Sequence, residues 1–278
     1  MRDVKRMIIS LFLIITLASA FLGCSQNSAG PANNQALNTP EAKNEVKIGF
    51  PSIPSNFDPL NGFSNGVQIM YSALVKTDKD MKIVPDLAES YTISEDALTY
   101  TFKLRHGALF SDGTPITAQD VVFSYNTLMN NATNIDLSVV DSVTASGDEV
   151  IITLKKPRSV FILTVANVGI VPEKSYSDAF ALNPICSGPY KLVQYDVDQQ
   201  FILEANEHYY GEAPKIKRVV FIKMADEDTR LLAVKSGIVD ITMTSATIAS
   251  TNTVKGYKLV NYKSVDNMGI AAPVVPPG

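Results

Sequence analysis

The sequence has no tryptophan, only two cysteines and two histidines in 278 residues, and no excess of basic residues. Two cysteines cannot form the disulfide framework of a small secreted domain, and His106 and His208 lack the spacing of a metal site. The 24 Lys and Arg against 28 Asp and Glu leave a net charge of −4. The chain therefore lacks the basic surface that binds phosphates, and we expect no nucleic-acid partner.

The length and the apolar content indicate a folded protein. A chain of 278 residues with 46% hydrophobic residues forms two domains or one large one, and buries roughly three quarters of its unfolded surface. Disorder is therefore not expected over most of the chain.

The first residues have the layout of an export signal. Three basic residues, Arg2, Lys5 and Arg6, precede an uncharged apolar run over residues 7–22, and the small residue Gly23 follows it. The run is shorter than the about 20 residues that a membrane-spanning helix needs, so an uncleaved membrane anchor is the weaker alternative. The sequence predicts a signal peptide over residues 1–23.

Cys24 directly follows Gly23 and resembles the lipidated cysteine of bacterial lipoproteins, where the thiol takes a diacylglyceryl group and becomes the new N-terminus. This resemblance implies export and anchoring through lipid on the outer face of the cytoplasmic membrane, at the cell surface or in the periplasm. Residues 25–44 hold no aromatic residue and a single large apolar one, Leu37. We therefore predict a flexible tether over residues 24–44.

From Glu45 onward the pattern predicts an α/β fold. Alternating apolar residues predict strands over residues 46–50, 98–104, 150–154 and 219–224. Helical spacing predicts a helix through Val67, Met70, Tyr71 and Leu74, a second one capped by Thr117 with Asp120 three positions on, and a third over residues 226–236. A turn is expected at residues 111–115.

Six segments resemble, in order, those of one protein family. They are residues 57–59 (FDP), 85–90 (PDLAES), 104–124 (LRHGALFSDGTPITAQDVVFS), 187–192 (SGPYKL), 206–211 (NEHYYG) and 229–240 (TRLLAVKSGIVD). Together they are similar to the extracytoplasmic solute-binding proteins of ABC importers, family 5, the peptide and nickel branch. Within the longest segment, residues 110–123 are expected to have mainly a scaffold role, since turn and capping rules account for their chemistry.

The resemblance implies a type II periplasmic-binding-protein clamshell that closes on a solute and then meets a membrane permease. Residues 45–66 and 175–278 would form the first lobe, and residues 67–174 an inserted subdomain. The expected partners are a peptide or other small solute and an ABC permease, with a monomeric protein and no cofactor. Members of the family are roughly twice as long, so we expect a truncated chain without its second lobe and with weak or no affinity of its own.

Loops at strand ends are where the solute contacts are expected, because their polar groups are free and held by the scaffold. The candidate ligand-binding residues are Ser55, Asn56, Phe57, Phe63, Asn65, Gln68, Asn167, Gly169, Cys186 and Ser187. For each of them an ordinary loop or cap role is the alternative. With Cys24 lipidated, Cys186 has no disulfide partner and is expected to be a buried apolar residue.

Three other functions compete with peptide capture for import. A nickel-chelate binding protein and a receptor that senses a peptide signal without transport would share the same fold. A secreted hydrolase is disfavoured, since His106 lies at the end of a strand and His208 precedes two tyrosines. His106 and Asp112 would be the only acid/base pair to consider, and a surface turn accounts for both.

Overall fold

The computed structural model describes residues 44–62, 67–131, 135–245 and 258. They belong to a unit formed by residues 42–278. Phe63, Asn65 and the side chain of Gln68, three of the predicted ligand contacts, lie outside the described residues, as do Cys24 and the predicted signal and tether.

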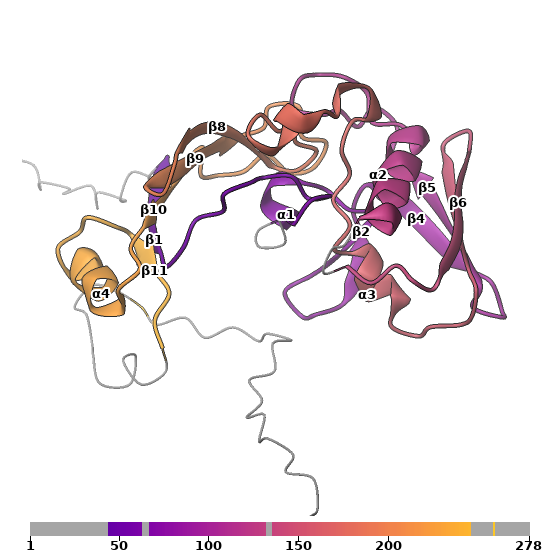
Figure 1. Cartoon of the computed structure of the whole chain (residues 1–278), viewed down its shortest axis with the longest axis horizontal. Helices are drawn as coiled ribbons and strands as arrows, with labels where there is room; N and C mark the ends of the chain where they lie inside the picture. The colour runs from indigo at the N-terminus through magenta and orange to yellow at the C-terminus, as the bar shows by residue number, and fades with distance from the viewer. Residues whose placement is uncertain (1–43, 63–66, 132–134, 246–257, 259–278) are drawn as a thin grey trace, which may run out of the picture. The chain divides into compact units, whose positions relative to one another are not determined.

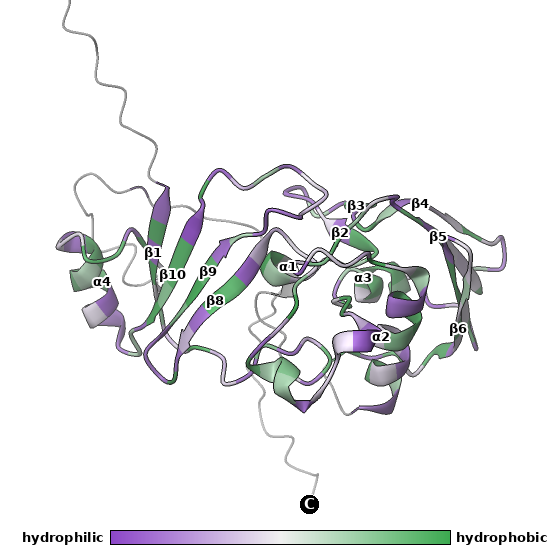
Figure 2. Ribbon diagram, turned by 90° about the horizontal axis from the view of Figure 1, so that it is seen from above, coloured by the Kyte–Doolittle hydropathy of each residue, from purple (hydrophilic) through white to green (hydrophobic). Residues whose placement is uncertain are grey.

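A five-stranded mixed sheet is built from the beginning and the end of the described chain (Figures 1 and 2). Its order is β11-β1-β10-β9-β8, with β1 parallel to both β10 and β11 and the other pairs antiparallel. The strands are β1 (Glu45–Phe50), β8 (Tyr190–Asp196), β9 (Gln200–Ala205), β10 (Arg218–Lys223) and β11 (Ile241–Thr242).

The middle of the chain forms a four-stranded antiparallel sheet in the order β4-β5-β7-β6. Its strands are β4 (Ala88–Ile93), β5 (Thr99–Leu104), β6 (Val140–Ser146) and β7 (Glu149–Leu154), and a small ribbon pairs β2 (Val75–Thr77) with β3 (Ile83–Pro85). In β5, Tyr100, Phe102 and Leu104 are buried while the residues between them are half-buried. The alternation read from the sequence is thus confirmed.

Four α-helices and two 3-10 turns lie among the described residues, and α2 lies over the four-stranded sheet in Figure 1. The elements are α1 (Val67–Met70), α2 (Ala118–Asn130), α3 (Phe161–Val165), α4 (Glu227–Lys235), η1 (Glu173–Ser175) and η2 (Asp178–Ala181). None of these helices is long and apolar enough to cross a membrane.

The predicted cap of α2 is confirmed. The Asp120 backbone N–H donates to the Thr117 hydroxyl at 3.3 Å, and the Thr117 backbone N–H donates to the Asp120 carboxylate at 2.8 Å, which together make a capping box. The predicted turn before it is present, with Gly113 at φ +84°. The third predicted helix is α4, with Asp226 as its N-cap and Gly237 at φ +74° just beyond its end.

The helix predicted through Leu74 was wrong in its length, because α1 ends at Met70. The backbone beyond it bonds to distant segments instead of closing helical turns. The Gly188 N–H donates to the Met70 carbonyl at 2.8 Å, and the Ile170 N–H donates to the Ser72 carbonyl at 3.0 Å. Tyr71 and Leu74 are buried, so the apolar spacing reflects burial rather than a helix.

One hydrophobic core includes residues from both large sheets, from α2 and from the loops between them. A smaller cluster of Ala233, Val234 and Val239 packs α4 against Ile222 and Met224. The five-stranded sheet draws on residues 45–50 and 190–242 and the four-stranded sheet on residues 88–154. The division into a first lobe and an inserted subdomain stays a prediction.

Candidate functional site

Three segments that are far apart in the sequence meet around Ser72 and Ser187. The Ser72 N–H donates to the Ser187 hydroxyl at 3.0 Å, and the Ser187 hydroxyl donates to the Ile170 carbonyl at 2.8 Å. Gly188 lies against Met70, and a Cβ built there would be only 2.6 Å from the Met70 carbonyl carbon. Only glycine fits this crossing, which explains one residue of the SGPYKL segment.

Two hydrogen bonds connect this crossing to the NEHYYG segment. The Tyr210 hydroxyl donates to the Ser72 hydroxyl at 2.8 Å, and the Asn206 side-chain amide donates to the Gly188 carbonyl at 2.9 Å. Ser72, Ser187 and Asn206 are buried, so these bonds satisfy polar groups that water does not reach. They fix the loop after β9 to the crossing.

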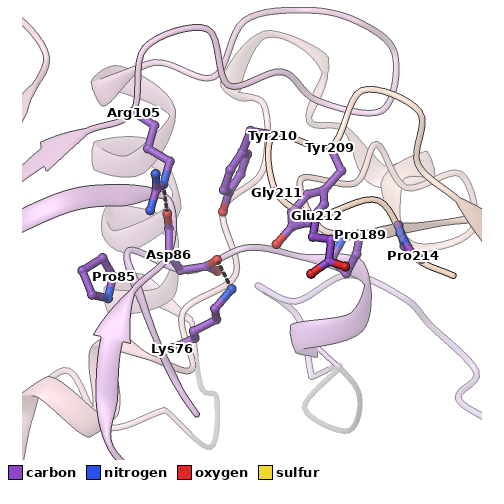
Figure 3. Close-up of a pocket in the computed structure, with 10 residues that line it drawn as sticks. All are labelled: Lys76, Pro85, Asp86, Arg105, Pro189, Tyr209, Tyr210, Gly211, Glu212 and Pro214. Carbon is purple, nitrogen blue, oxygen red and sulfur yellow. Dashed lines mark hydrogen bonds and ion pairs between the residues drawn. The ribbon is translucent and has the colours of Figure 1, made fainter.

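Beyond Tyr210 this loop faces a pocket with a volume of about 420 Å³ (Figure 3). The pocket is lined by Lys76, Pro85, Asp86, Arg105, Pro189, Tyr209, Tyr210, Gly211, Glu212 and Pro214. Figure 3 shows Lys76, Asp86 and Arg105 on one side, near the ends of β2, β3 and β5, and Tyr209, Glu212 and Pro214 on the other.

An ion pair forms one wall of the pocket. The Lys76 ammonium lies 3.0 Å from the Asp86 carboxylate, which is buried, whereas the Lys76 side chain is 45% exposed. Burial alone would lower the pKa of Lys76, but the charge of Asp86 and its hydrogen bond outweigh burial and raise that pKa. The Arg105 Nε donates to the Asp86 backbone carbonyl at 2.5 Å.

Two adjacent tyrosines form the other wall. Their rings lie 4.8 Å apart, and the Arg105 guanidinium lies 5.9 Å from the centre of the Tyr210 ring, within cation–π range. Burial raises the pKa of Tyr210, and the negative charge of Asp86 adds to the rise. Burial raises the pKa of Tyr209 too. Both hydroxyls therefore keep their protons and act as hydrogen-bond donors at neutral pH.

The predicted ligand contacts that the structure describes fall into two groups. Phe57, Gly169, Cys186 and Ser187 are buried, whereas Asn56 is half-buried and Ser55 and Asn167 are exposed. The Phe57 ring packs 5.1 Å from Tyr195 and 5.3 Å from Phe201, so it belongs to the core. Burial raises the pKa of Cys186 to about 12, which keeps it a neutral thiol, as expected of a buried apolar residue.

The polar candidates at the surface mostly bond to their own loops. The Asn56 side-chain Oδ1 accepts from the Asp58 backbone N–H at 2.6 Å, and the Asn167 side-chain amide donates to the Leu163 carbonyl at 2.8 Å. Asp58 is itself buried and accepts from the Tyr176 hydroxyl at 2.6 Å. Local hydrogen bonds therefore hold both segments, 55–57 and 167–169, and the bond of Asp58 to the distant Tyr176 adds support next to the first.

The geometry gives little support to a hydrolase. His106 lies 3.4 Å from Asp148, with its side chain 80% exposed, and the proposed partner Asp112 bonds to Thr114 instead. Residues 62–66 read GFSNG, which fits the Gly-x-Ser-x-Gly pattern of a nucleophile elbow. Such an elbow follows a strand directly, but the last strand before Gly62 ends at Phe50. The described residues include no group of three His, Cys, Asp or Glu that would hold a metal ion.

Sequence reasoning missed the pocket as a site, although its residues were in the segments it singled out. Asp86, Arg105, Pro189 and Tyr210 belong to four of the six family-like segments, which extend over more than a hundred residues of the chain. From the sequence these segments indicated only the family, and none of the four residues was selected as a ligand contact. They meet at one pocket because hydrogen bonds at the crossing of Ser72 and Ser187, and from Tyr210 to Ser72, join distant segments, and a single sequence does not reveal such contacts.

The fold and these segments define a class of protein, the type II periplasmic binding proteins. Solved structures of that class match the chain. The structure of NikZ from Campylobacter jejuni with Ni(L-His) matches 75% of this chain at 27% identity with a TM-score of 0.69. That of the oligopeptide-binding protein AppA from Bacillus subtilis with a nonapeptide matches 74% at 26% identity with a TM-score of 0.67.

Within this class, the family model of the bacterial extracellular solute-binding proteins, family 5, matches residues 82–272, and the chain belongs to that family. Curated relatives include Protein XP55 of Streptomyces lividans, 31% identical over 84% of this chain. The nickel-binding periplasmic protein of Escherichia coli is 30% identical over 70% of this chain. The chain spans 45% of the first of these relatives and 39% of the second.

Proposed function

We propose that this chain acts in solute capture for an ABC importer, as a lipid-anchored binding protein exported to the outer face of the cytoplasmic membrane. The solute would be a peptide or a related small molecule, handed to a membrane permease. No reaction is catalysed in this proposal, and no cofactor takes part. The observation that carries it is the match of the solute-binding family model to residues 82–272.

The solute contacts would come from the loops that sequence reasoning selected and that keep polar groups at the surface. Ser55 and Asn167 are exposed, and Asn56 is half-buried. Their neutral donors and acceptors suit the amide groups of a peptide, and the local bonds of Asn56 and Asn167 preorganise the loops. The buried candidates Phe57, Cys186 and Ser187 would support these loops from behind.

Uptake in cells tests the proposal directly. A strain without the gene should take up a radiolabelled dipeptide or tripeptide more slowly than its parent, and expression of the full chain should restore the rate. Lost uptake identifies an importer component. Unchanged uptake together with a lost transcriptional response to the peptide would identify a sensor and contradict the transport proposal.

A nickel chelate is the second candidate solute, because the chain is similar to the NikZ structure determined with Ni(L-His). The described residues offer no cluster of metal ligands, so the metal would arrive within a chelate that supplies its own ligands. Uptake of radioactive nickel with and without histidine, in the same pair of strains, separates this candidate from peptide uptake.

A further inference from the structure

The motif-lined pocket beside Tyr210 carries an inference about the kind of molecule it accepts. Lys76 and Asp86 neutralise each other across 3.0 Å, so this pair leaves no net charge for a ligand. What remains is one cation and one anion on different segments. Arg105 follows β5, and Glu212 lies in the loop between β9 and β10.

The Arg105 guanidinium is held in place while part of it stays available. Its Nε donates to the Asp86 carbonyl, and its Cζ lies over the Tyr210 ring. In the described part of the chain, the two terminal nitrogens have no hydrogen-bond or ion-pair partner. A fixed guanidinium with free terminal nitrogens matches the geometry of a carboxylate, which it binds with two parallel hydrogen bonds.

Glu212 provides the opposite charge. It is exposed and makes no ion pair or hydrogen bond with a described residue. Figure 3 places it across the pocket from Arg105, with the ring of Tyr209 on its side of the pocket. A ligand with an ammonium group at one end and a carboxylate at the other would meet both charges at once, and the protonated Tyr209 hydroxyl would donate between them.

We propose that this pocket binds a compact zwitterion of the size of a dipeptide, with its carboxylate on Arg105 and its ammonium on Glu212. A volume of about 420 Å³ lies within the range of small-molecule sites. The inference rests on the proposed function in one respect, namely that the zwitterion is the solute to be imported. The pocket is a different place from the solute contacts selected from the sequence, because none of those residues lines it. Among its lining residues, only Pro189 lies next to a selected loop, the one with Cys186 and Ser187.

The absence of tryptophan offers a local reporter of occupancy. Pro85 lines the pocket and is exposed, so the full chain carrying Pro85→Trp has a single indole at its rim. Alanyl-alanine should change its fluorescence in a saturable way. The N-acetylated dipeptide and the dipeptide amide, each lacking one charge, should bind at least about tenfold more weakly. A Val197→Trp chain, whose indole would lie at a position 70% exposed and outside this pocket, is the matched reporter and should not respond.

Substitutions in the reporter chain then assign each charge. Glu212→Gln should weaken alanyl-alanine about tenfold without affecting the N-acetylated form, and Arg105→Lys should weaken it without affecting the amide. Glu95→Gln, at an exposed residue of another loop, is the control and should change nothing. Blocked dipeptides that bind as well as the free one, or an unchanged affinity in Glu212→Gln, would overturn the inference.

Uptake separates this inference from the proposed function. Binding at the Pro85→Trp reporter by a chain that supports no uptake would leave the pocket assigned and remove the importer role. Dipeptide uptake by a chain whose reporter never responds would keep the importer role and remove the pocket.

Discussion

Gly188 shows how a single residue can be fixed by a backbone crossing. Its φ is not in the left-handed region, so the requirement for glycine comes from contact alone, with a Cβ at 2.6 Å from the Met70 carbonyl carbon and 2.7 Å from the Tyr71 nitrogen. Gly188→Ala should therefore lower the free energy of unfolding by about 2 to 3 kcal/mol, as measured by urea denaturation.

Gly147→Ala is the matched control for that measurement. Gly147 has φ +63° and nothing within 4 Å of its added Cβ, so alanine there costs only the left-handed conformation, about 1 kcal/mol. An equal loss in the two variants would mean that the segments separate easily, and the crossing would not be the rigid support that the candidate site needs.

Cys186 leads to a prediction about pH. Burial disfavours the thiolate and raises the pKa of the folded Cys186 thiol to about 12, whereas an exposed cysteine has a pKa of 9.0. Between these values the unfolded chain binds fewer protons than the folded one. The contribution of this residue to stability is thus complete below pH 9 and falls as the pH rises toward 12.

The same burial should make the thiol unreactive. In a chain carrying Cys24→Ser, which leaves Cys186 as the single cysteine, an aromatic disulfide reagent at pH 8 should react only after urea is added. Rapid reaction without urea would show that the segment around Cys186 opens to solvent, and would return this residue to the candidates for direct solute contact.

At the scale of an element, the capping box of α2 makes a clear prediction. Thr117→Ala removes the acceptor for the Asp120 N–H and should destabilise the protein by about 1 kcal/mol in urea denaturation. Thr117→Ser should restore most of the loss, since it keeps the hydroxyl. Gln119→Ala, an exposed position in the same helix, is the control, and a loss as large as that of Thr117→Ala would argue against the cap as the cause.

Elements with strong local signals could be predicted from the sequence. The strands β1, β5, β7 and β10, the capped helix α2 and the helix α4 all lie where alternation, caps and turn glycines placed them. The helix through Leu74 failed because its backbone bonds to Gly188 and Ile170, more than ninety residues away. Strands β8 and β9 were missed, and in β8 the burial pattern does not alternate.

The candidate site was harder to predict than the elements. Phe57 and Ser187 were selected because they lie in loops near strand ends, but the structure places their side chains in the interior, as it does that of Cys186, whose burial was expected. Residue type and loop position do not reveal whether a side chain points outward. Arg105 follows β5 of the four-stranded sheet, and Tyr210 lies in the loop between β9 and β10 of the five-stranded sheet. They face one pocket because of contacts between distant segments, such as the hydrogen bond of Tyr210 to Ser72, which a single sequence does not reveal.

At the scale of the whole molecule, the distribution of the core predicts where the fold opens first. The main cluster includes β5 and β7, whereas α4 is held by the small cluster of Ala233, Val234 and Val239. In hydrogen exchange, the amides of α4 should exchange by local opening, well before those of β5, which require global unfolding. Equal protection of α4 and β5 would show a single cooperative unit that this division of the core does not explain.

The N-terminal segment predicts where the molecule resides. If Cys24 is lipidated, cells fed labelled palmitate should produce a labelled protein that begins at the modified cysteine. That protein should stay with the membrane, because two or more acyl chains hold a protein there stably. Cys24→Ser should take no label, and Ser25→Ala, which leaves the thiol in place, should be labelled like the wild type. A protein that keeps residues 1–23 and takes no label, yet stays with the membrane, would instead support the uncleaved anchor. In that case the tether over residues 24–44 would start from a protein segment rather than from lipid.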